Sequence, residues 1–154
     1  MKKSLAIVVL TWNDFKNTIK CIKSIYPQLN SNNKLILIDN NSDDKIFNRT
    51  LQWIENKYSK KYFYLKVVKK YQNALRKKKI FIIRNKKNLG CGMGHNTGYK
   101  FAIKNNFDFI SRIDNDMIVT NEFFKKLLKH FKNKNINGVS PKIMYTKKPK
   151  NIWW

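Results

Sequence analysis

The stretch FDFISRIDND, residues 107–116, decides the fold because an apolar run passes directly into two carboxylates. Phe109 and Ile113 belong to a segment with the composition of a buried strand, and Asp114 and Asp116 follow at once. The chain has only 9 acidic residues against 33 lysines and arginines, so two of its few carboxylates stand at this one point. Two like charges so close repel each other unless a cation lies between them.

Strand and helix patterns alternate along the rest of the chain. β-Branched apolar runs indicate strands, whereas apolar residues three and four apart indicate helices. The expected strands are SLAIVVLT (4–11), KLILID (34–39), KIFIIRN (79–85), FDFISRID (107–114) and NGVSPKIMY (137–145). The expected helices follow Asn13, the polar run 40–44, the glycine-rich turn 88–98 and Thr120. We expect Asn13 to be the N-cap of the first helix and Pro27 to be its stop. This order predicts an α/β fold with a mostly parallel sheet and helices on both faces.

Length and composition favour one compact domain, residues 1–154. A chain of 154 residues that is 42% hydrophobic can bury a core. It has no apolar run of the roughly 18–20 residues that a membrane span needs. Residues 57–79 mix aromatics with lysines, so we expect a solvated insertion with an extra hairpin or helix, the alternative being a membrane-docking segment. The two cysteines, Cys21 and Cys91, fit neither a disulfide framework nor a zinc site, which favours a reducing, cytoplasmic setting.

The net charge of +24 has two interpretations. A strongly basic face binds nucleic acid by releasing counterions from phosphates. However, 29 of the 33 basic residues are lysines, the chain has 21 asparagines, and the lysines are spread over its whole length. Such a composition is typical of an AT-rich genome, and we favour this interpretation. A positive surface would still attract nucleotide phosphates or the anionic inner leaflet of a membrane.

Four polar clusters follow the predicted strands. In a parallel sheet, ligands bind beyond the carboxyl ends of the strands, so these clusters are expected along one edge. They are Thr11–Asn13, Asp39–Asp44, Asn85–Asn96 and Asp114–Asp116. The Asp114–Asp116 pair suits a hard divalent cation that holds a diphosphate, the alternative being a turn whose side chains cap the next helix.

The other clusters contain further candidate ligand contacts. NLGCGMGHNTG (88–98) carries four of the five glycines and would let backbone N–H groups approach a phosphate, the alternative being a plain turn. His95 is expected to be a solvated loop residue rather than a general base. Asp39 could accept hydrogen bonds from a ribose or base, or cap a helix. Trp12 could stack on a base, or pack against the sheet edge.

Together, IVVLTWN, LILIDNNSDD, NLGCGMGHNTG, RIDNDM and NGVSPKIMY resemble the motifs of the family-2 glycosyltransferases of the GT-A fold, in their rhamnosyltransferase-like branch. The resemblance spans nearly the whole chain except residues 57–79, and the combination is specific although each motif alone is not. It implies an inverting transferase that binds a nucleotide-diphospho-sugar and transfers the sugar to a cell-surface glycan or a lipid-linked acceptor. The implied location is cytoplasmic, with peripheral association at the inner face of the membrane as an option.

The resemblance also implies roles for individual residues. Thr11 and Trp12 would line the base pocket, and Asp39 would bind the base or ribose. Asp114 would lie near the ribose and the metal, with Asp116 as the principal ligand of Mn²⁺ or Mg²⁺. The remaining implied substrate contacts are Asn13, Asn41, Gly90, Asn96 and Asn115.

One part of the family pattern is missing from this sequence. Inverting transfer needs a carboxylate base, and the only acid after Asp116 is Glu122, which is better explained by its place near a helix start. We therefore expect the base downstream of Trp154, the acceptor-binding segment to be absent, and transfer by the chain alone to be poor. The competing hypotheses are a nucleic-acid-binding protein and an inactive scaffold module.

Overall fold

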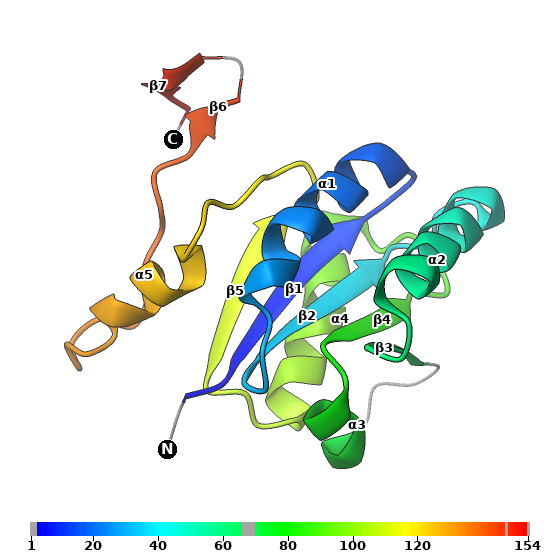
Figure 1. The fold of residues 1–154 in the computed structure, drawn as a ribbon, viewed down its shortest axis with the longest axis horizontal. Coiled ribbons are helices and arrows are strands. Elements are labelled where there is room, and N and C mark those ends of the chain that lie inside the picture. Colours follow the sequence, from blue (N-terminus) through cyan, green and yellow to red (C-terminus); the bar gives the residue numbers. More distant parts are fainter. Residues whose placement is uncertain (1–2, 66–69, 147, 154) are drawn as a thin grey trace. The chain divides into compact units, whose positions relative to one another are not determined.

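The computed structural model describes residues 3–65, 70–146 and 148–153 (Figure 1). The chain divides into two compact units, Met1–Val119 and Thr120–Trp154. The first unit contains the sheet and all of the polar clusters that the sequence places at its carboxyl edge.

The first unit is built on a five-stranded sheet in the order β3-β4-β2-β1-β5, with every neighbouring pair parallel (Figure 1). The strands are β1 (Leu5–Thr11), β2 (Asn33–Asp39), β3 (Tyr62–Leu65), β4 (Ile80–Arg84) and β5 (Phe109–Asp114). The chain adds strands on one side of β1 up to β4 and then crosses to its other side for β5. In such sheets this reversal opens a crevice at the carboxyl ends of the two strands that flank it.

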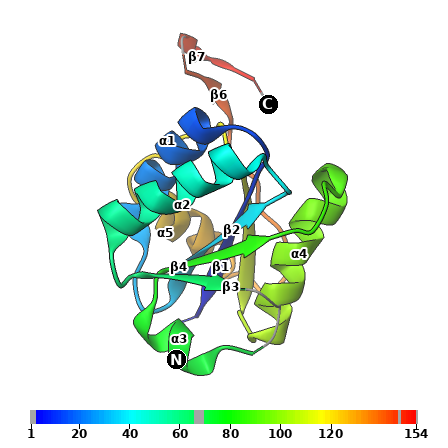
Figure 2. The same cartoon turned by 90° about the vertical axis from the view of Figure 1, so that its right-hand side faces the viewer.

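Helices cover both faces of the sheet, as the alternating pattern predicted. α1 (Phe15–Ile25) and α2 (Asp44–Tyr58) lie on one face, and α4 (Gly90–Lys104) lies on the other (Figure 2). α1 continues into a 3₁₀ turn, Tyr26–Gln28, that contains Pro27. The α1 N-cap is Asp14, whose carboxylate accepts from the Asn17 backbone N–H, so the expectation that Asn13 caps this helix is wrong. Asn13 has a positive φ of 51°, which turns it away from that role.

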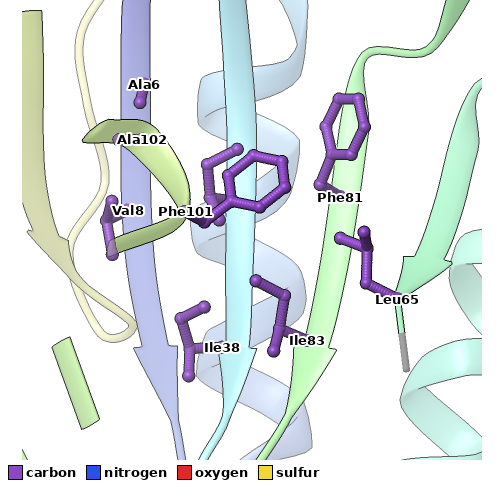
Figure 3. Packing of buried hydrophobic residues seen from close by; sticks show 9 residues of the cluster. Ala6, Val8, Ile38, Leu65, Phe81, Ile83, Phe101 and Ala102 are labelled. Carbon is purple, nitrogen blue, oxygen red and sulfur yellow. The ribbon is translucent and has the colours of Figure 1, made fainter. Parts of the chain in front are cut away.

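The core lies between the sheet and its helices. On the α4 side, alternate residues of the strands point toward the helix, because successive side chains of a strand face opposite ways. Phe101 and Ala102 of α4 pack against this surface (Figure 3). The strand residues of the cluster are Ala6, Val8, Ile36, Ile38, Leu65, Phe81 and Ile83. The sequence identifies β1, β2 and β4 because their burial on both faces requires nearly continuous apolar runs.

The segment 57–79 adds an edge to the sheet instead of forming a hairpin. β3 pairs parallel to β4, and a short helix α3 (Gln72–Lys77) precedes β4. Residues 66–69 of this segment lie outside the described residues. Ala74 and Leu75 of α3 pack against the core cluster, so this segment is part of the fold.

The second unit differs from the prediction at its end. α5 (Phe123–His130) matches the expected amphipathic helix. The expected strand at 137–145 is wrong, because only β6 (Met144–Tyr145) is a strand there, and it pairs antiparallel with β7 (Lys148–Ile152). Gly138 and Pro141 interrupt the segment, and proline lacks the N–H that a ladder needs. In the parts of the chain that the structure describes, no helix combines the length and apolar character needed to cross a bilayer.

Candidate functional site at the carboxyl edge of the sheet

A cavity of about 470 Å³ opens at the carboxyl ends of β1 and β5, beside the start of α4. The cavity lies where the strand order reverses, which is where ligands bind in such sheets. The lining residues come from all four predicted clusters and from two of the strands that precede them. They are Leu10, Thr11, Trp12, Asn40, Asn88, Gly90, Cys91, His95, Arg112, Asp114, Asn115 and Asp116. We call this the carboxyl-edge cavity.

The acid pair lines this cavity. Asp114 is the last residue of β5, and the turn that follows is closed by the Met117 N–H, which donates to the Asp114 carbonyl at 3.0 Å. We call residues 114–117 the acid turn. Asp114 Oδ1 accepts from the Arg112 guanidinium, from Nη2 at 3.1 Å and from Nε at 3.2 Å. The cation beside Asp114 in the protein itself is therefore Arg112, while the Asp116 side chain is exposed.

Arg112 was not among the predicted site residues, although the sequence contains a signal for it. It stands two residues before Asp114 in β5, and side chains two apart on a strand share a face. A basic residue two positions before an acid at a strand end can therefore pair with it on the same face. Nε and Nη2 contact one carboxylate oxygen, so the guanidinium fixes the Asp114 side chain from one direction.

The carboxylates at the cavity suit a divalent cation only if the ligand completes its shell. Asp114 and Asp116 offer hard oxygen donors, and the Asp114 side chain is 45% exposed. Within the described ranges, no three His, Cys, Asp or Glu side chains lie close enough to hold a metal ion on their own. A magnesium or manganese site here would therefore be a shared one, with protein carboxylates on one side and phosphate oxygens and water on the other.

His95 is buried, and the expectation of a solvated loop residue is wrong. The reason is that α4 begins at Gly90, so that the glycine-rich stretch is helical and His95 faces inward. Its Nδ1 lies 2.9 Å from the Cys91 carbonyl, an acceptor, so Nδ1 carries the proton. Its Nε2 is buried, has no hydrogen-bond partner among the described residues, and lies 3.9 Å from Asp114 Oδ1. Burial lowers the pKa of the His95 imidazole below its usual value.

Asn40 holds the start of α4 against the end of β2. Its amide Nδ2 donates to Asn88 Oδ1 at 2.8 Å and to the Gly90 carbonyl at 3.2 Å. Its Oδ1 accepts from Asn85 Nδ2 at 3.0 Å and from the Leu89 N–H at 3.1 Å. The side-chain amide of Asn40 thus makes four hydrogen bonds, all of them to residues 85–90. At the end of this segment Gly90 has φ +72°, a conformation that glycine adopts without strain.

Three predicted asparagines, Asn13, Asn41 and Asn96, lie outside this cavity lining. Asn41 is exposed with φ +66°, and its neighbour Asn40 reaches the cavity instead. Asn96 is exposed on α4, and its Nδ2 contacts the Met93 sulfur at 3.7 Å. Asn13 joins two loops, because its N–H donates to Ser42 Oγ at 2.9 Å and its Oδ1 accepts from the Asp43 N–H at 2.8 Å.

Asp39 is committed to the protein scaffold. It is 3% exposed, lies outside the lining of the carboxyl-edge cavity, and accepts from the Ser42 N–H at 3.1 Å. Arg84 Nε lies 3.2 Å from its Oδ2. The same guanidinium contacts Asp44 Oδ1 at 2.8 Å and donates to the Ser42 carbonyl at 2.6 Å. Burial raises the pKa of Asp39, opposed by the Ser42 hydrogen bonds and by Arg84. Its contact with a base or ribose stays a prediction.

Thr11 and Trp12 both line the carboxyl-edge cavity, and their contact with a base stays a prediction. Thr11 is buried and its hydroxyl lies 2.6 Å from Thr18 Oγ1. The Trp12 side chain lines the cavity and is 56% exposed, which is high for a tryptophan. An indole held in this way at a cavity wall offers a flat face to a planar ligand.

The parallel sheet and its helical layers, with a cavity beyond the end of β5, have the architecture of the GT-A fold. The chain belongs to glycosyl transferase family 2, whose family model matches residues 56–154.

Solved structures of similar fold include S. aureus TarS. Residues 1–349 of that protein superpose with a TM-score of 0.60 at 18% identity, covering 93% of this chain and 40% of TarS 1–349. The structure of TarS 1–349 in complex with UDP gives a TM-score of 0.55 at the same 18% identity, covering 93% of this chain and 39% of that one. This chain thus spans well under half the length of the relatives it matches. No curated protein matches it.

Proposed function

We propose that this chain binds the nucleotide-diphosphate part of an activated sugar in the carboxyl-edge cavity, as the donor-binding part of an inverting glycosyltransferase. One observation carries the proposal: the acid turn and Trp12 line the same cavity, at the point where the strand order reverses. Membership of family 2 supports it, and the TarS complex makes UDP the first nucleotide to test. The motif resemblance supports the rhamnosyltransferase-like branch and a glycan or lipid-linked acceptor.

Each wall of the cavity has a distinct task in this proposal. Trp12 stacks on the base. The start of α4 attracts the diphosphate through the positive end of the helix dipole, while the Gly90 N–H itself donates to Asn88 Oδ1 at 2.8 Å. Asp114 and Asp116 hold the dication, and Arg112 orients Asp114. When bound, Mn²⁺ or Mg²⁺ supplies charge neutralisation for the departing diphosphate.

No described residue is assigned as the base that takes the proton of the acceptor. Glu122, the one acid that follows Asp116 in the sequence, forms an ion pair with Lys125. Its hydrogen bond to Lys125 holds the pKa of the Glu122 carboxyl below its usual value, which favours the charged form but leaves the side chain engaged. The proposal therefore concerns donor binding, and the transfer step needs a carboxylate besides those described here.

The test is a binding panel on the purified chain with UDP, dTDP and GDP and their sugars, each with and without Mn²⁺. We expect stabilisation that needs both nucleotide and metal, reaching about 2.7 kcal/mol when the ligand is at 100 times its Kd. Mn²⁺ alone should stabilise little, because the protein supplies few of its ligands.

Two substitutions sharpen this panel. Asp116→Asn should abolish the metal-dependent part of the stabilisation, since it removes one carboxylate from the acid turn. Glu55→Gln is the matched control, because it removes an equal charge from the exposed surface of α2, outside the cavity lining. A folded wild-type chain that responds to no nucleotide would refute donor binding. Binding of RNA that is steep in salt and survives Asp116→Asn would favour the nucleic-acid hypothesis.

The charge of the chain supports a second element of the proposal, peripheral association with the inner face of the cell membrane. A net charge of +24 attracts the anionic leaflet, at about 1 kcal/mol for each lysine or arginine near the surface. Sedimentation with phosphatidylserine-containing vesicles at low salt, lost at high salt and absent with neutral vesicles, is the expected result. Absence of sedimentation with either vesicle type would refute it.

A further inference from the structure

A small polar cluster lies directly behind the acid turn. It joins Thr11 at the end of β1, Asp14 and Thr18 at the start of α1, and Asn115 in the acid turn. We call it the threonine–asparagine cluster. Thr18 is fully buried at its centre, and Thr11 and Asn115 both line the carboxyl-edge cavity. The cluster thus connects the nucleoside side of the cavity with its metal side.

The Thr18 hydroxyl uses every hydrogen bond that it can make. It donates to the Asp14 carbonyl, which can only accept. The Thr11 hydroxyl, 2.6 Å away, must therefore donate to Thr18 Oγ1. Asn115 Nδ2 donates to the same oxygen at 3.2 Å. One donated and two accepted hydrogen bonds saturate a hydroxyl, so Thr18 permits a single arrangement of its neighbours.

The hydrogen bonds of Asn115 fix its side chain in the same way. Its Nδ2 donates to Thr18 Oγ1 and, at 3.3 Å, to Asp14 Oδ2. Asp14 is itself held, because it accepts from the Asn17 N–H at 3.1 Å and from Asn17 Nδ2 at 2.9 Å. Both N–H groups of the Asn115 amide are therefore tied to the first turn of α1. The residue between the two aspartates is attached to a helix that is rigidly packed on the sheet.

We propose that Thr18 is a positioning residue that fixes the acid turn for metal-dependent binding of the nucleotide. This inference rests on the proposed function and names a residue that does not line the cavity. Two carboxylates on a short turn repel each other, and a cation with strict geometry binds well only if they are already placed. Thr18 holds the turn through Asn115, and through Thr11 it ties the turn to the strand end that carries Trp12.

The chain offers a matched control for this role. Thr50 in α2 also donates its hydroxyl to the carbonyl four residues earlier, Ile46, at 2.9 Å, and it is 8% exposed. Thr50→Val and Thr18→Val therefore lose the same intrahelical hydrogen bond and keep the same side-chain shape. Only Thr18→Val also removes the partner of Asn115.

The experiment measures UDP binding by calorimetry with and without Mn²⁺. We expect Thr18→Val to reduce the Mn²⁺-dependent gain in UDP affinity by about tenfold, a size seen when outer-shell partners of metal ligands are removed. UDP affinity without metal should stay within about twofold of wild type. Thr18→Ser should restore the gain, because serine keeps the hydroxyl, and Thr50→Val should match wild type.

A double-mutant cycle with Asn115→Ala separates positioning from general destabilisation. If Thr18 acts through Asn115, Thr18→Val should have no further effect on the Mn²⁺-dependent gain once Asn115 is truncated. Equal losses from Thr18→Val and Thr50→Val would overturn the inference, as would an unchanged gain in Thr18→Val. If Thr18→Val does not fold, Thr18→Ser and Asn115→Ala are compared instead. Equal losses of the Mn²⁺-dependent gain in UDP affinity in these two variants would contradict a role for the Thr18 hydroxyl, because serine keeps that hydroxyl.

These outcomes also distinguish the two proposals. Wild-type protein that binds no UDP overturns the proposed function, and the role of Thr18 with it. Wild-type protein that binds UDP with a metal-dependent gain, together with a Thr18→Val variant that keeps the full gain, overturns the positioning role alone.

Discussion

Gly98 lies so close to Val8 that a Cβ atom built on it would stand 2.4 Å from Val8 Cγ1. The same atom would be 3.3 Å from Ile38 Cγ1, so it would meet β1 and β2 together. This close approach lets α4 lie directly on the sheet and sets the distance between its first turn and the end of β1. The geometry of the carboxyl-edge cavity depends on it.

We therefore expect Gly98→Ala to lower the free energy of unfolding by about 1–3 kcal/mol, because the added methyl group overfills the core. Gly92→Ala in the same helix should instead raise it by about 0.5–1 kcal/mol, since nothing lies within 4 Å of the new Cβ and alanine favours a helix. Urea denaturation of the two variants measures both values. Equal stabilities would contradict the close packing of α4.

Cys91 and Cys21 should differ in reactivity. Burial raises the pKa of the Cys21 thiol to about 12, with Asp116 and Asp114 adding to the effect, and Cys21 is 0% exposed. Cys91 is exposed and lines the carboxyl-edge cavity. A thiol reagent should therefore modify one cysteine in the folded protein, and Cys91→Ser should remove this reaction.

UDP with Mn²⁺ should protect Cys91 if the nucleotide occupies the cavity. At a ligand concentration ten times the Kd, the rate of modification should fall about tenfold. The rate with a nucleoside alone is the control. Unchanged labelling at saturating UDP would place the nucleotide elsewhere.

Trp12 should contribute to nucleotide binding whether or not metal is present. A stacked base contributes about 1–3 kcal/mol, so Trp12→Ala should weaken UDP binding by about fivefold or more. Trp12→Phe should keep most of the affinity because it keeps an aromatic face. Trp53→Phe, on α2 against Tyr58, is the control outside the cavity lining. An affinity loss confined to samples with Mn²⁺ would argue against stacking.

Asp108 predicts a pH dependence of stability. The Ser4 N–H and hydroxyl donate to its Oδ2 at 2.7 and 2.8 Å, which holds the pKa of this carboxyl below its usual 3.8. A lowered folded-state pKa stabilises the protein above pH 3.8, and this contribution is lost as the pH falls through the folded-state value. Asp108→Asn should thus lower the melting temperature at pH 7, and the difference from wild type should shrink below pH 3.8. A difference independent of pH would contradict this origin.

The sequence predicts β1, β2 and β4 well because these strands are buried on both faces. The runs 4–11 and 34–39 correspond to β1 (Leu5–Thr11) and β2 (Asn33–Asp39), and 107–114 contains β5. Strand β3 escaped prediction since its residues, YFYL, are partly exposed at the sheet edge and lie among lysines. The strand expected at 137–145 is absent before Met144, because Gly138 and Pro141 interrupt the segment despite its apolar residues.

Local sequence pattern correctly placed those candidate residues whose position depends on a single element, and it missed contacts between distant residues. Asp114 and Asp116 follow from a strand end alone. The partnership of Asp39 with Arg84 joins residues 45 positions apart, and no local pattern indicates it. His95 was misplaced because four glycines suggest a turn, whereas hydrogen bonds between Asn40 and residues 89–90 hold this segment at the start of a helix.

Arg84 is a basic residue that lysine cannot replace without losing contacts. The protein has 29 lysines and only 4 arginines, so lysine is the usual answer to a need for positive charge. Arg84 contacts Asp39, Asp44 and the Ser42 carbonyl with three different nitrogens. A lysine ammonium is a single point and cannot reach all three acceptors at once. Arg84→Lys would therefore leave at least one of these three acceptors without its present partner, although lysine is the commonest basic residue of this protein.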